Sequence, residues 1–497
     1  MTISIWPLAP WVALGLLIVT ALSYLITAVR PGIRHAPGPF LARFTNWWRV
    51  AQVVKGQYPQ KLLELHKKHG PIVRIGPNQV SISDPQAVPQ VYGFTAKYLK
   101  GSFYNSMSGR YQGAVLHNLF TEQDPAAHRE KKLPVSAKYA MASIRALEPL
   151  TEKCTEIFLN AMKDLEGQRI DLGEWLQWYA FDVISYVSFQ RTFGFMEQRK
   201  DVRSMIASLD AAVLYGAVVG YFPWLHKYLI GSDTTMAILT KVFPNIPNPV
   251  AYIFEVTLEE IQRYDRQGQE DKVQRGDFLA WMREEMKKGK STITQRDLIT
   301  HMSTNLLAGS DTTAIILRGV FYYLIKDPVR FQKLQTEIDD ANSKGSLSER
   351  ITFTECQQLP YLQAVIKEAL RLSPPLCCPL ERLVPEGGDV ICGKRLGRKT
   401  VVGISPWVVQ RDPTVFGEDF SAFRPERWME GSEERLKIME KTMMAFGAGA
   451  RTCMGKSFQH SQKDSKLTVR RQKRCSLRND QVYSRGPSKV HLRMGLG

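Results

Sequence analysis

Ten residues near the end of the chain read Phe446-Gly447-Ala448-Gly449-Ala450-Arg451-Thr452-Cys453-Met454-Gly455, and they carry the clearest indication of the fold. The glycines let the backbone turn tightly and approach a flat ligand closely. Amide N–H groups in such a turn can point at the Cys453 sulfur and stabilise its thiolate. A thiolate held in this way is a candidate axial ligand for haem iron. The alternative is a glycine-rich surface loop with a buried free cysteine, which suits an isolated Cys-x-Gly better than a ten-residue pattern.

The composition indicates one large globular domain. The chain has 497 residues, 44% of them hydrophobic, and it contains no internal repeat. Its seven cysteines are odd in number and lack paired Cys-x-x-Cys spacing, which argues against a disulfide framework or a zinc site. The bulk of the chain is therefore expected in a reducing compartment. The net charge is +18, but no nucleic-acid motif accompanies it, so nucleic-acid binding is not expected.

The N-terminal segment predicts a membrane anchor. No charged residue occurs from Thr2 to Val29, and the 22 residues from Leu8 to Val29 are long enough to cross ~30 Å of hydrocarbon as a helix. Basic residues follow at once, which places the body of the protein in the cytosol by the positive-inside rule. A cleaved signal peptide is the alternative, but it usually has a basic start and a shorter apolar core. We expect a single-pass anchor over 1–30, then a proline- and glycine-rich hinge over 31–40 that sets the angle of the body to the membrane.

Periodicity and turn residues predict the main elements of the body. We expect a helix over 57–69, a hairpin over 72–77 and 79–83, and mostly helices from about 124 to 345. Thr294 and Asp297 form a candidate capping box that opens a long helix to about residue 325. A further helix is expected over about 359–372, followed by short β-like segments over 380–405.

The long helix contains the sequence Ala308-Gly309-Ser310-Asp311-Thr312-Thr313. Small residues leave one face with little bulk, so a flat ligand or O₂ could approach there. An acid beside a hydroxyl can relay protons to a reactive centre. The alternative is a helix kink in which the threonines bond back to the preceding turn. The residues alone leave both interpretations open.

Glu368 and Arg371 lie three residues apart and share one face of a predicted helix. A pair of this kind is usually exposed and contributes only tenths of a kcal/mol. A structural role needs a third partner that buries the pair, and Arg427 in the Pro-Glu-Arg-Trp sequence is a candidate. Arg382 and Arg451 could then pair with acidic groups of a cofactor.

Four elements therefore follow one another: the acid–alcohol helix, Glu-x-x-Arg, the Pro-Glu-Arg-Trp turn and the cysteine loop. In this order they make the chain resemble the cytochrome P-450 family of haem-thiolate monooxygenases. The resemblance runs from the anchor to Gly455, and the stretch His66–Asn78 is similar to membrane-bound fungal members. It implies a mainly α fold with small β-sheets, preceded by one transmembrane helix, with the haem-thiolate domain over 41–455.

The resemblance also implies roles for individual residues. Cys453 would be the axial ligand of the iron of haem b, and Asp311 with Thr312 would deliver protons. The other residues placed against the haem are Arg451, Arg382, His128, Lys132, Ala308, Gly309 and Phe446, the first four of them at its propionates. Family members usually carry arginine where this chain has Lys132, which offers a point charge and not a fork. Glu368, Arg371 and Arg427 would form a buried charge network behind the haem.

The partners implied are a membrane-bound reductase that passes electrons from NADPH, membrane lipids and a lipophilic small-molecule substrate. The expected location is the endoplasmic reticulum membrane, with the catalytic domain facing the cytosol. The substrate pocket is expected near residues 101–118, 205–225 and 376–384, and the pathway is expected to belong to fungal secondary metabolism. The alternative functions are a haem-thiolate isomerase or dehydratase, against which Asp311 and Thr312 argue, and a truncated inactive member.

The family pattern fails after Gly455. Only eleven of residues 456–497 are hydrophobic, and eleven Lys or Arg stand there against Asp464 and Asp480, which gives +9. This composition predicts an aberrant, basic, disordered tail. A missing core helix would expose apolar surface whose burial contributes ~25 cal/mol per Å². The sequence therefore predicts that this chain holds haem poorly or is inactive, while a chain with a regular C-terminal part would be active.

Overall fold

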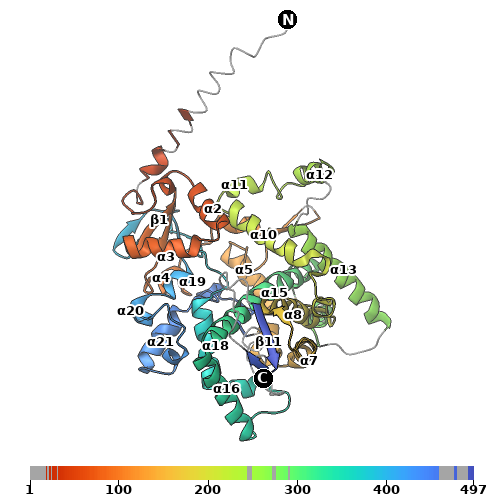
Figure 1. Cartoon of the computed structure of the whole chain (residues 1–497). Coiled ribbons are helices and arrows are strands. Elements are labelled where there is room, and N and C mark those ends of the chain that lie inside the picture. Colours follow the sequence, from red (N-terminus) through yellow and green to blue (C-terminus); the bar gives the residue numbers. More distant parts are fainter. Residues whose placement is uncertain are drawn as a thin grey trace.

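The computed structural model describes residues 18–19, 22–23, 25–30, 32–112, 114–242, 249–270, 276–288, 292–457, 475–477 and 491–496. Within them the chain is mainly helical with small sheets, as the sequence predicts (Figure 1). The elements that hold the candidate site are described first, because the remaining helices and strands surround them.

Two long helices pack along each other at the centre of the body. These are α8 (Leu172–Phe189) and α15 (Gln295–Lys326). Thr294 caps α15, since its side chain accepts from the Asp297 N–H and the Asp297 side chain accepts from the Thr294 N–H, which confirms the predicted capping box. Most of α8 is apolar on every side, and a helix of that kind is stable only when it is buried.

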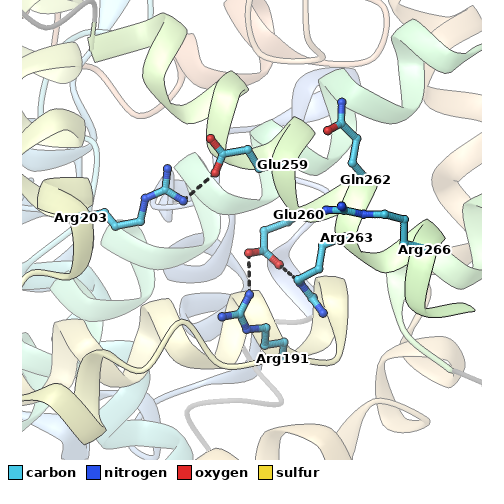
Figure 2. A pocket seen from close by; sticks show the side chains of 7 residues that line it. All are labelled: Arg191, Arg203, Glu259, Glu260, Gln262, Arg263 and Arg266. Atoms are coloured by element: carbon cyan, nitrogen blue, oxygen red, sulfur yellow. Dashed lines mark hydrogen bonds and ion pairs between the residues drawn. The ribbon is translucent and has the colours of Figure 1, made fainter.

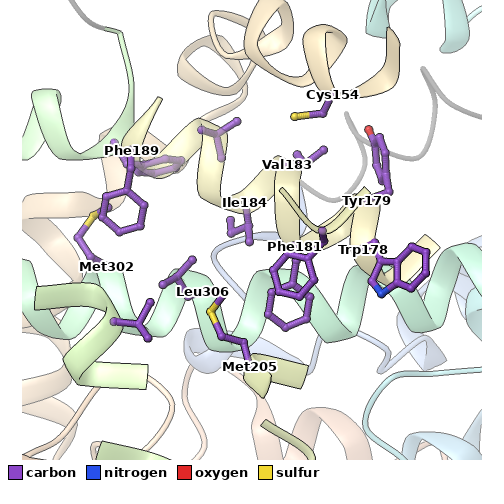
Figure 3. Close-up of a cluster of buried hydrophobic side chains, with 14 of the residues drawn as sticks. Cys154, Trp178, Tyr179, Phe181, Val183, Ile184, Phe189, Met205, Met302 and Leu306 are labelled. Atoms are coloured by element: carbon purple, nitrogen blue, oxygen red, sulfur yellow. The ribbon is translucent and has the colours of Figure 1, made fainter. Parts of the chain in front are cut away.

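The largest hydrophobic core forms around α8 (Figure 3). Phe181, Ile184 and Phe189 of α8 pack there with Met302 and Leu306 of α15. Three further helices cover this core, namely α7 (Glu148–Asp164), α13 (Pro249–Glu270) and α14 (Phe278–Lys287). The interior position of α15 places the predicted acid–alcohol segment at the centre of the fold.

A four-stranded sheet lies at the N-terminal side of the body, in the order β1-β2-β9-β6. Strand β1 (Ile72–Gly76) pairs antiparallel with β2 (Gln79–Ile82), which pairs parallel with β9 (Val401–Ile404). Strand β6 (Arg382–Leu383) adds to β9 in antiparallel register, with Arg382 opposite Val402. All residues of β1 and β2 are buried, because helices and loops cover this sheet.

Helix α18 (Pro360–Leu372) packs against the 3₁₀ helix η6 (Pro425–Trp428) and against α15. The expected helix over 57–69 is α3 (Tyr58–His69), and the hairpin and the helix near 359–372 also form.

The remaining helices are α2 (Trp47–Val54), α4 (Ala87–Tyr92), α5 (Pro125–Lys132), α6 (Met141–Arg145), α9 (Phe195–Gln198), α10 (Met205–Val219), α11 (Pro223–His226), α12 (Asp233–Val242), α16 (Pro328–Ser343), α17 (Phe353–Cys356), α19 (Pro406–Val409), α20 (Pro413–Phe416) and α21 (Glu433–Thr442). Further 3₁₀ helices are η2 (Phe40–Arg43), η3 (Ser102–Met107), η4 (Leu133–Tyr139), η5 (Val202–Ser204) and η7 (Gly449–Arg451). The other strands are β3 (Gly109–Tyr111), β4 (Ala114–Leu116), β5 (Arg169–Asp171), β7 (Asp389–Ile391), β8 (Lys394–Leu396), β10 (Cys475–Leu477) and β11 (His491–Leu496).

The predicted anchor at 8–29 lies mostly outside the described residues. Residues 25–28 are helical, and the side chains of Leu25 and Ile26 are 58% and 70% exposed. Among the described residues, one helical stretch is long and apolar enough to cross a membrane, Val202–Val219, by length and composition only. Because α10, which forms most of that stretch, packs on α13 and η3, we assign it to the folded body.

The C-terminal region contributes two strands that the sequence did not predict. Strands β10 and β11 pair with each other, and β11 pairs antiparallel with β5, with His491 opposite Asp171. The sequence analysis predicted disorder for the whole tail, and this prediction is wrong for these two segments, which form paired strands. The tail's other residues after Ser457 lie outside the described residues.

Candidate active site

The cysteine loop turns through two left-handed glycines. Gly447 has φ +70° and Gly449 has φ +62°, and a Cβ on Gly449 would lie 1.8 Å from the Tyr92 carbonyl oxygen. The Cys453 N–H donates to the Phe446 carbonyl at 2.9 Å, which closes the loop. The Cys453 side chain is exposed, whereas Phe446 packs on a buried cluster. Cys453 is therefore an accessible thiol on a loop whose backbone only glycine permits at position 449.

Ala308 is an exposed residue of α15, whereas the other residues from 301 to 320 are buried or partly buried. The Thr312 hydroxyl donates to the Ala308 carbonyl at 2.5 Å, so the back-bonded threonine that the sequence left open is present. Gly309 turns toward α8, where an added Cβ would lie 2.7 Å from Ile184 Cδ1. We expected Gly309 over the face of a flat ligand, but the structure gives it another reason to be small, the close contact between α15 and α8.

Asp311 points toward α8 and accepts a hydrogen bond from the Gln177 Nε2 amide at 3.3 Å. The Gln177 Oε1 atom accepts from Arg318 Nη2 at 2.6 Å, which fixes the orientation of the amide. Burial raises the pKa of Asp311, nearby Asp210 raises it further, and Arg318 opposes the change. Asp311 therefore keeps a proton to a higher pH than an exposed aspartate does.

Five basic side chains converge where the cysteine loop meets α5 and β6: Arg382, Arg451, His128, Lys132 and Lys100. The hydrogen bonds of Arg382 and Arg451 go to carbonyl and phenol oxygens, including the Glu381 carbonyl at 2.8 Å and the Glu122 carbonyl at 2.7 Å. Lys132 donates to the Ala450 carbonyl at 3.2 Å. Lys100 donates to the Phe120 carbonyl.

Burial and neighbouring basic side chains lower the pKa of three members of this cluster, Arg451, Lys100 and His128, while Glu122 opposes the change. Burial lowers the pKa of Arg451, and Arg382 lowers it further. Burial lowers the pKa of Lys100 well below its ordinary value, with Arg382 and Arg451 adding to the effect. Burial, Arg451, Lys100 and Lys132 lower the pKa of His128 to about 4. A ligand with two carboxylates would relieve this repulsion, so the cluster fits the propionates of haem.

Lys100 is a member of this cluster that the sequence did not reveal. It is 6% exposed and lies over the rings of Tyr104 and Phe120, at 4.4 and 4.8 Å from their centroids. No motif surrounds it, because its neighbours in space come from distant parts of the chain. Only the fold brings it to Arg382 and Arg451.

Glu368, Arg371 and Arg427 form one buried ion network. The Glu368 carboxylate accepts from Arg371 Nε at 2.9 Å and Nη2 at 2.8 Å, and from Arg427 Nε at 2.9 Å. The Trp428 indole N–H also donates to it at 2.9 Å. The three charged side chains are at most 1% exposed. The remaining guanidinium donors go to backbone carbonyls and to Asp419, so the network fastens α18 to η6 and to the loop before it.

A separate polar pocket of about 320 Å³ lies over α13 (Figure 2). Its charged side chains pair with one another, as in Arg203–Glu259 at 2.8 Å and Arg191–Glu260 at 3.0 Å. It is lined by Arg191, Arg203, Glu259, Glu260, Gln262, Arg263 and Arg266. None of these residues belongs to the candidate active site.

Three features of this site are those of a haem-thiolate oxygenase. They are an exposed cysteine in a glycine-rich loop, a cluster of basic side chains that suits a dianionic ligand, and an acid on the central helix. The sequence model of the family described as Cytochrome P450 matches residues 36–463, and the chain belongs to this family. It is 36% identical to a cytochrome P450 monooxygenase of Aspergillus terreus over 87% of this chain and 88% of that protein. Cytochrome P450 monooxygenase cicH of Emericella nidulans is also 36% identical, over 87% and 86%, and pisatin demethylase of Fusarium vanettenii is 34% identical, over 86% and 80%. The chain is therefore an oxidoreductase of the monooxygenase type, and its family implies a haem-thiolate cofactor.

Proposed function

We propose that this protein inserts one oxygen atom from O₂ into a lipophilic small molecule, with Cys453 as the thiolate ligand of haem b. The observation that carries the proposal is the cluster of five basic side chains that adjoins the cysteine loop. Arg382, Arg451, His128, Lys132 and Lys100 would bind the two propionates. The hydrogen bonds of Arg382, Arg451, Lys132 and Lys100 go to carbonyl and phenol oxygens, and the nearby carboxylate Glu122, which pairs with Lys131, offsets only part of the positive charge. The bound haem supplies the iron centre at which dioxygen is reduced.

The residues of α15 would serve the other face of the cofactor. Ala308 leaves room for a flat ring and a small molecule above it. Burial and Asp210 raise the pKa of Asp311, so it keeps a proton to a higher pH than an exposed aspartate and can act as the proton source. The Thr312 hydroxyl, which now donates to the Ala308 carbonyl, would pass that proton by turning toward the reacting atoms. Glu368, Arg371 and Arg427 would hold the opposite side of the fold in place.

We further propose a single-pass anchor in the endoplasmic reticulum, with the body in the cytosol and electrons supplied by an NADPH-dependent reductase in the same membrane. The uncharged stretch before Arg30 and the exposed Leu25 and Ile26 side chains support the anchor. The fungal origin of the similar proteins supports a place in secondary metabolism and a lipophilic substrate. One of them carries the name pisatin demethylase, which describes that protein.

The test is to express the full chain, reconstitute it with a reductase and offer lipophilic candidate substrates. The proposal expects product formation that needs both NADPH and O₂. Turnover without either one would support the isomerase or dehydratase alternative instead. Loss of turnover in Asp311→Asn, with haem content and the ferrous carbon monoxide spectrum unchanged, would support the assigned proton route.

The composition of the region after Gly455 favours a second candidate, a family member that no longer secures haem. Its test is the haem content per chain, measured beside a chimera whose residues 456–497 are replaced by the corresponding part of the Aspergillus terreus relative. Equal haem content in the two proteins would eliminate this candidate. Haem in the chimera alone would establish it.

A further inference from the structure

Arg74 lies in the middle of β1 and is fully buried, at 0% exposure. Buried arginines normally pair with a carboxylate. The hydrogen bonds that the structure describes for this guanidinium instead go to five backbone carbonyl oxygens. They are those of Ala28 at 2.9 Å, Thr27 at 2.7 Å, Pro77 at 2.6 Å, Arg43 at 3.3 Å and Gly76 at 3.3 Å.

Two of these acceptors belong to the end of the N-terminal helical segment. Residues 25–28 are helical, and Thr27 and Ala28 stand in the last turn. The last carbonyls of a helix lack partners within the helix and carry its partial negative charge. A cation at that end satisfies the carbonyls and interacts favourably with the dipole. Arg74 therefore caps this helical segment from within the sheet.

The other acceptors tie two more elements to the same guanidinium. The Arg43 carbonyl ends η2, and the Gly76 and Pro77 carbonyls form the turn of the β1–β2 hairpin. The backbone of Arg74 also holds the hinge, since its N–H donates to the Pro37 carbonyl at 2.7 Å. A Cβ on Gly38 would lie 2.2 Å from the Arg74 carbonyl oxygen, so the hinge passes directly over this strand.

Arg74 keeps its charge at neutral pH. Burial, together with the nearby Arg43 and Arg30, lowers its pKa to about 10. A lysine could not replace it, because an ammonium is a point charge with three donors, whereas the guanidinium is a planar fork with five. The site thus suits arginine in both charge and shape.

We propose that Arg74 is a positioning residue that locks the N-terminal helical segment to the catalytic body, so that the body is held at one angle to the membrane. The inference rests on the anchor in the proposed function. The hinge itself packs on the body through Ile33 and Ala36, which are 0% and 4% exposed, whereas the Arg74 side chain binds the end of the helical segment before the hinge. Arg74 binds the Arg43 carbonyl at the end of η2, and α2 packs on η2. Phe40 and Leu41 of η2 and Trp47 of α2 are 73%, 57% and 60% exposed. Large apolar and aromatic side chains of this kind favour the interface of a lipid bilayer.

The test uses the full chain in phospholipid nanodiscs and measures amide hydrogen exchange by mass spectrometry. Arg74→Lys and Arg74→Gln are compared with the unmodified chain. The control is Arg398→Gln, which removes an exposed arginine paired with Glu386 at 2.8 Å. Peptides covering residues 25–45 report the lock, and peptides from α15 report the rest of the fold. The readout does not require bound haem.

We expect exchange over residues 25–45 to rise by about tenfold or more in both Arg74 variants, since each lost hydrogen bond to a charged group corresponds to at least about tenfold in local opening. Exchange in α15 and in the Arg398 variant should stay unchanged. Unchanged exchange over 25–45 would overturn the proposal, and so would an equal rise in α15, which would mean that Arg74 acts on the whole fold. If Arg74→Gln does not fold, Arg74→Lys decides. Release of the unmodified chain from the bilayer by alkaline carbonate would refute the anchor and, with it, the orienting role, whatever the exchange shows.

Discussion

Replacing Glu368 by glutamine should destabilise this protein more than most single substitutions do. The carboxylate accepts two hydrogen bonds from Arg371 and one each from Arg427, the Trp428 indole and the Arg424 backbone. Glutamine keeps the shape but removes the negative charge, and it turns an N–H₂ group toward one of the donors. Two buried guanidinium groups then lose their shared counter-charge.

The magnitude follows from burial. Breaking a buried ion pair by removing one partner costs about 3–5 kcal/mol, because it leaves an uncompensated buried charge. A typical free energy of unfolding is about 5–15 kcal/mol, so the variant should lose between about a fifth and all of it. An exposed pair contributes only about 0–1 kcal/mol. Glu440 forms such a pair with Lys367 at 2.6 Å, where the two side chains are 56% and 44% exposed.

The assay is urea unfolding of the unmodified chain, Glu368→Gln and the matched control Glu440→Gln, followed by far-ultraviolet circular dichroism. The midpoint should fall strongly for the Glu368 variant and stay nearly constant for the control. The reasoning would be refuted if the two variants unfolded at the same urea concentration.

Three further predictions concern packing, pH and haem retention. Gly309→Val should destabilise the fold by about 1–3 kcal/mol by overpacking against Ile184. In thermal melting, Ile184→Val, which removes the Cδ1 atom that the new side chain meets, should recover part of this loss, and Gly276→Ala, where nothing lies within 4 Å, should have little effect. Burial lowers the pKa of His66 from 6.5 to about 4, so the unfolded chain takes up this proton at a higher pH than the folded chain does. The stability that neutral His66 contributes is therefore complete above pH 6.5 and is lost as the pH falls toward 4. Urea midpoints measured across that range should fall less steeply for His66→Gln than for the unmodified chain. Lys100→Met should weaken haem retention during gel filtration. If the variant retained haem as well as the unmodified chain does, Lys100 would have no role in binding the propionates.

The sequence predicted correctly those features that depend on residues close together in the chain. The capping box at Thr294, the Glu368–Arg371 spacing and the glycines of the cysteine loop each operate within a few residues, and the structure contains all three features. Lys100 and the contacts of Gly309 could not be predicted, because they depend on segments that are far apart in the chain. The sequence indicated that Asp311 and Thr312 belong together, but not that Gln177 holds the aspartate.

The tail and Arg74 illustrate the same limit in other ways. The composition of the tail predicted disorder, yet β11 pairs with β5, since main-chain hydrogen bonding does not depend on side-chain hydrophobicity. Arg74 stood inside a predicted strand with no acidic neighbour in sequence. Its carbonyl partners could only be found once the hairpin, η2 and the N-terminal segment were placed in space.

The most direct test of the haem-thiolate assignment is the carbon monoxide difference spectrum of the reduced protein, with haem measured per chain, before and after Cys453→Ala. The spectra should be recorded on the unmodified chain and on the chimera with the replaced C-terminal part. The comparison separates haem loss caused by the C-terminal region from haem loss caused by the substitution of Cys453. Haem-loaded protein should show a thiolate-type band, and Cys453→Ala should abolish it. A variant that kept the same band and the same amount of haem would contradict the assignment.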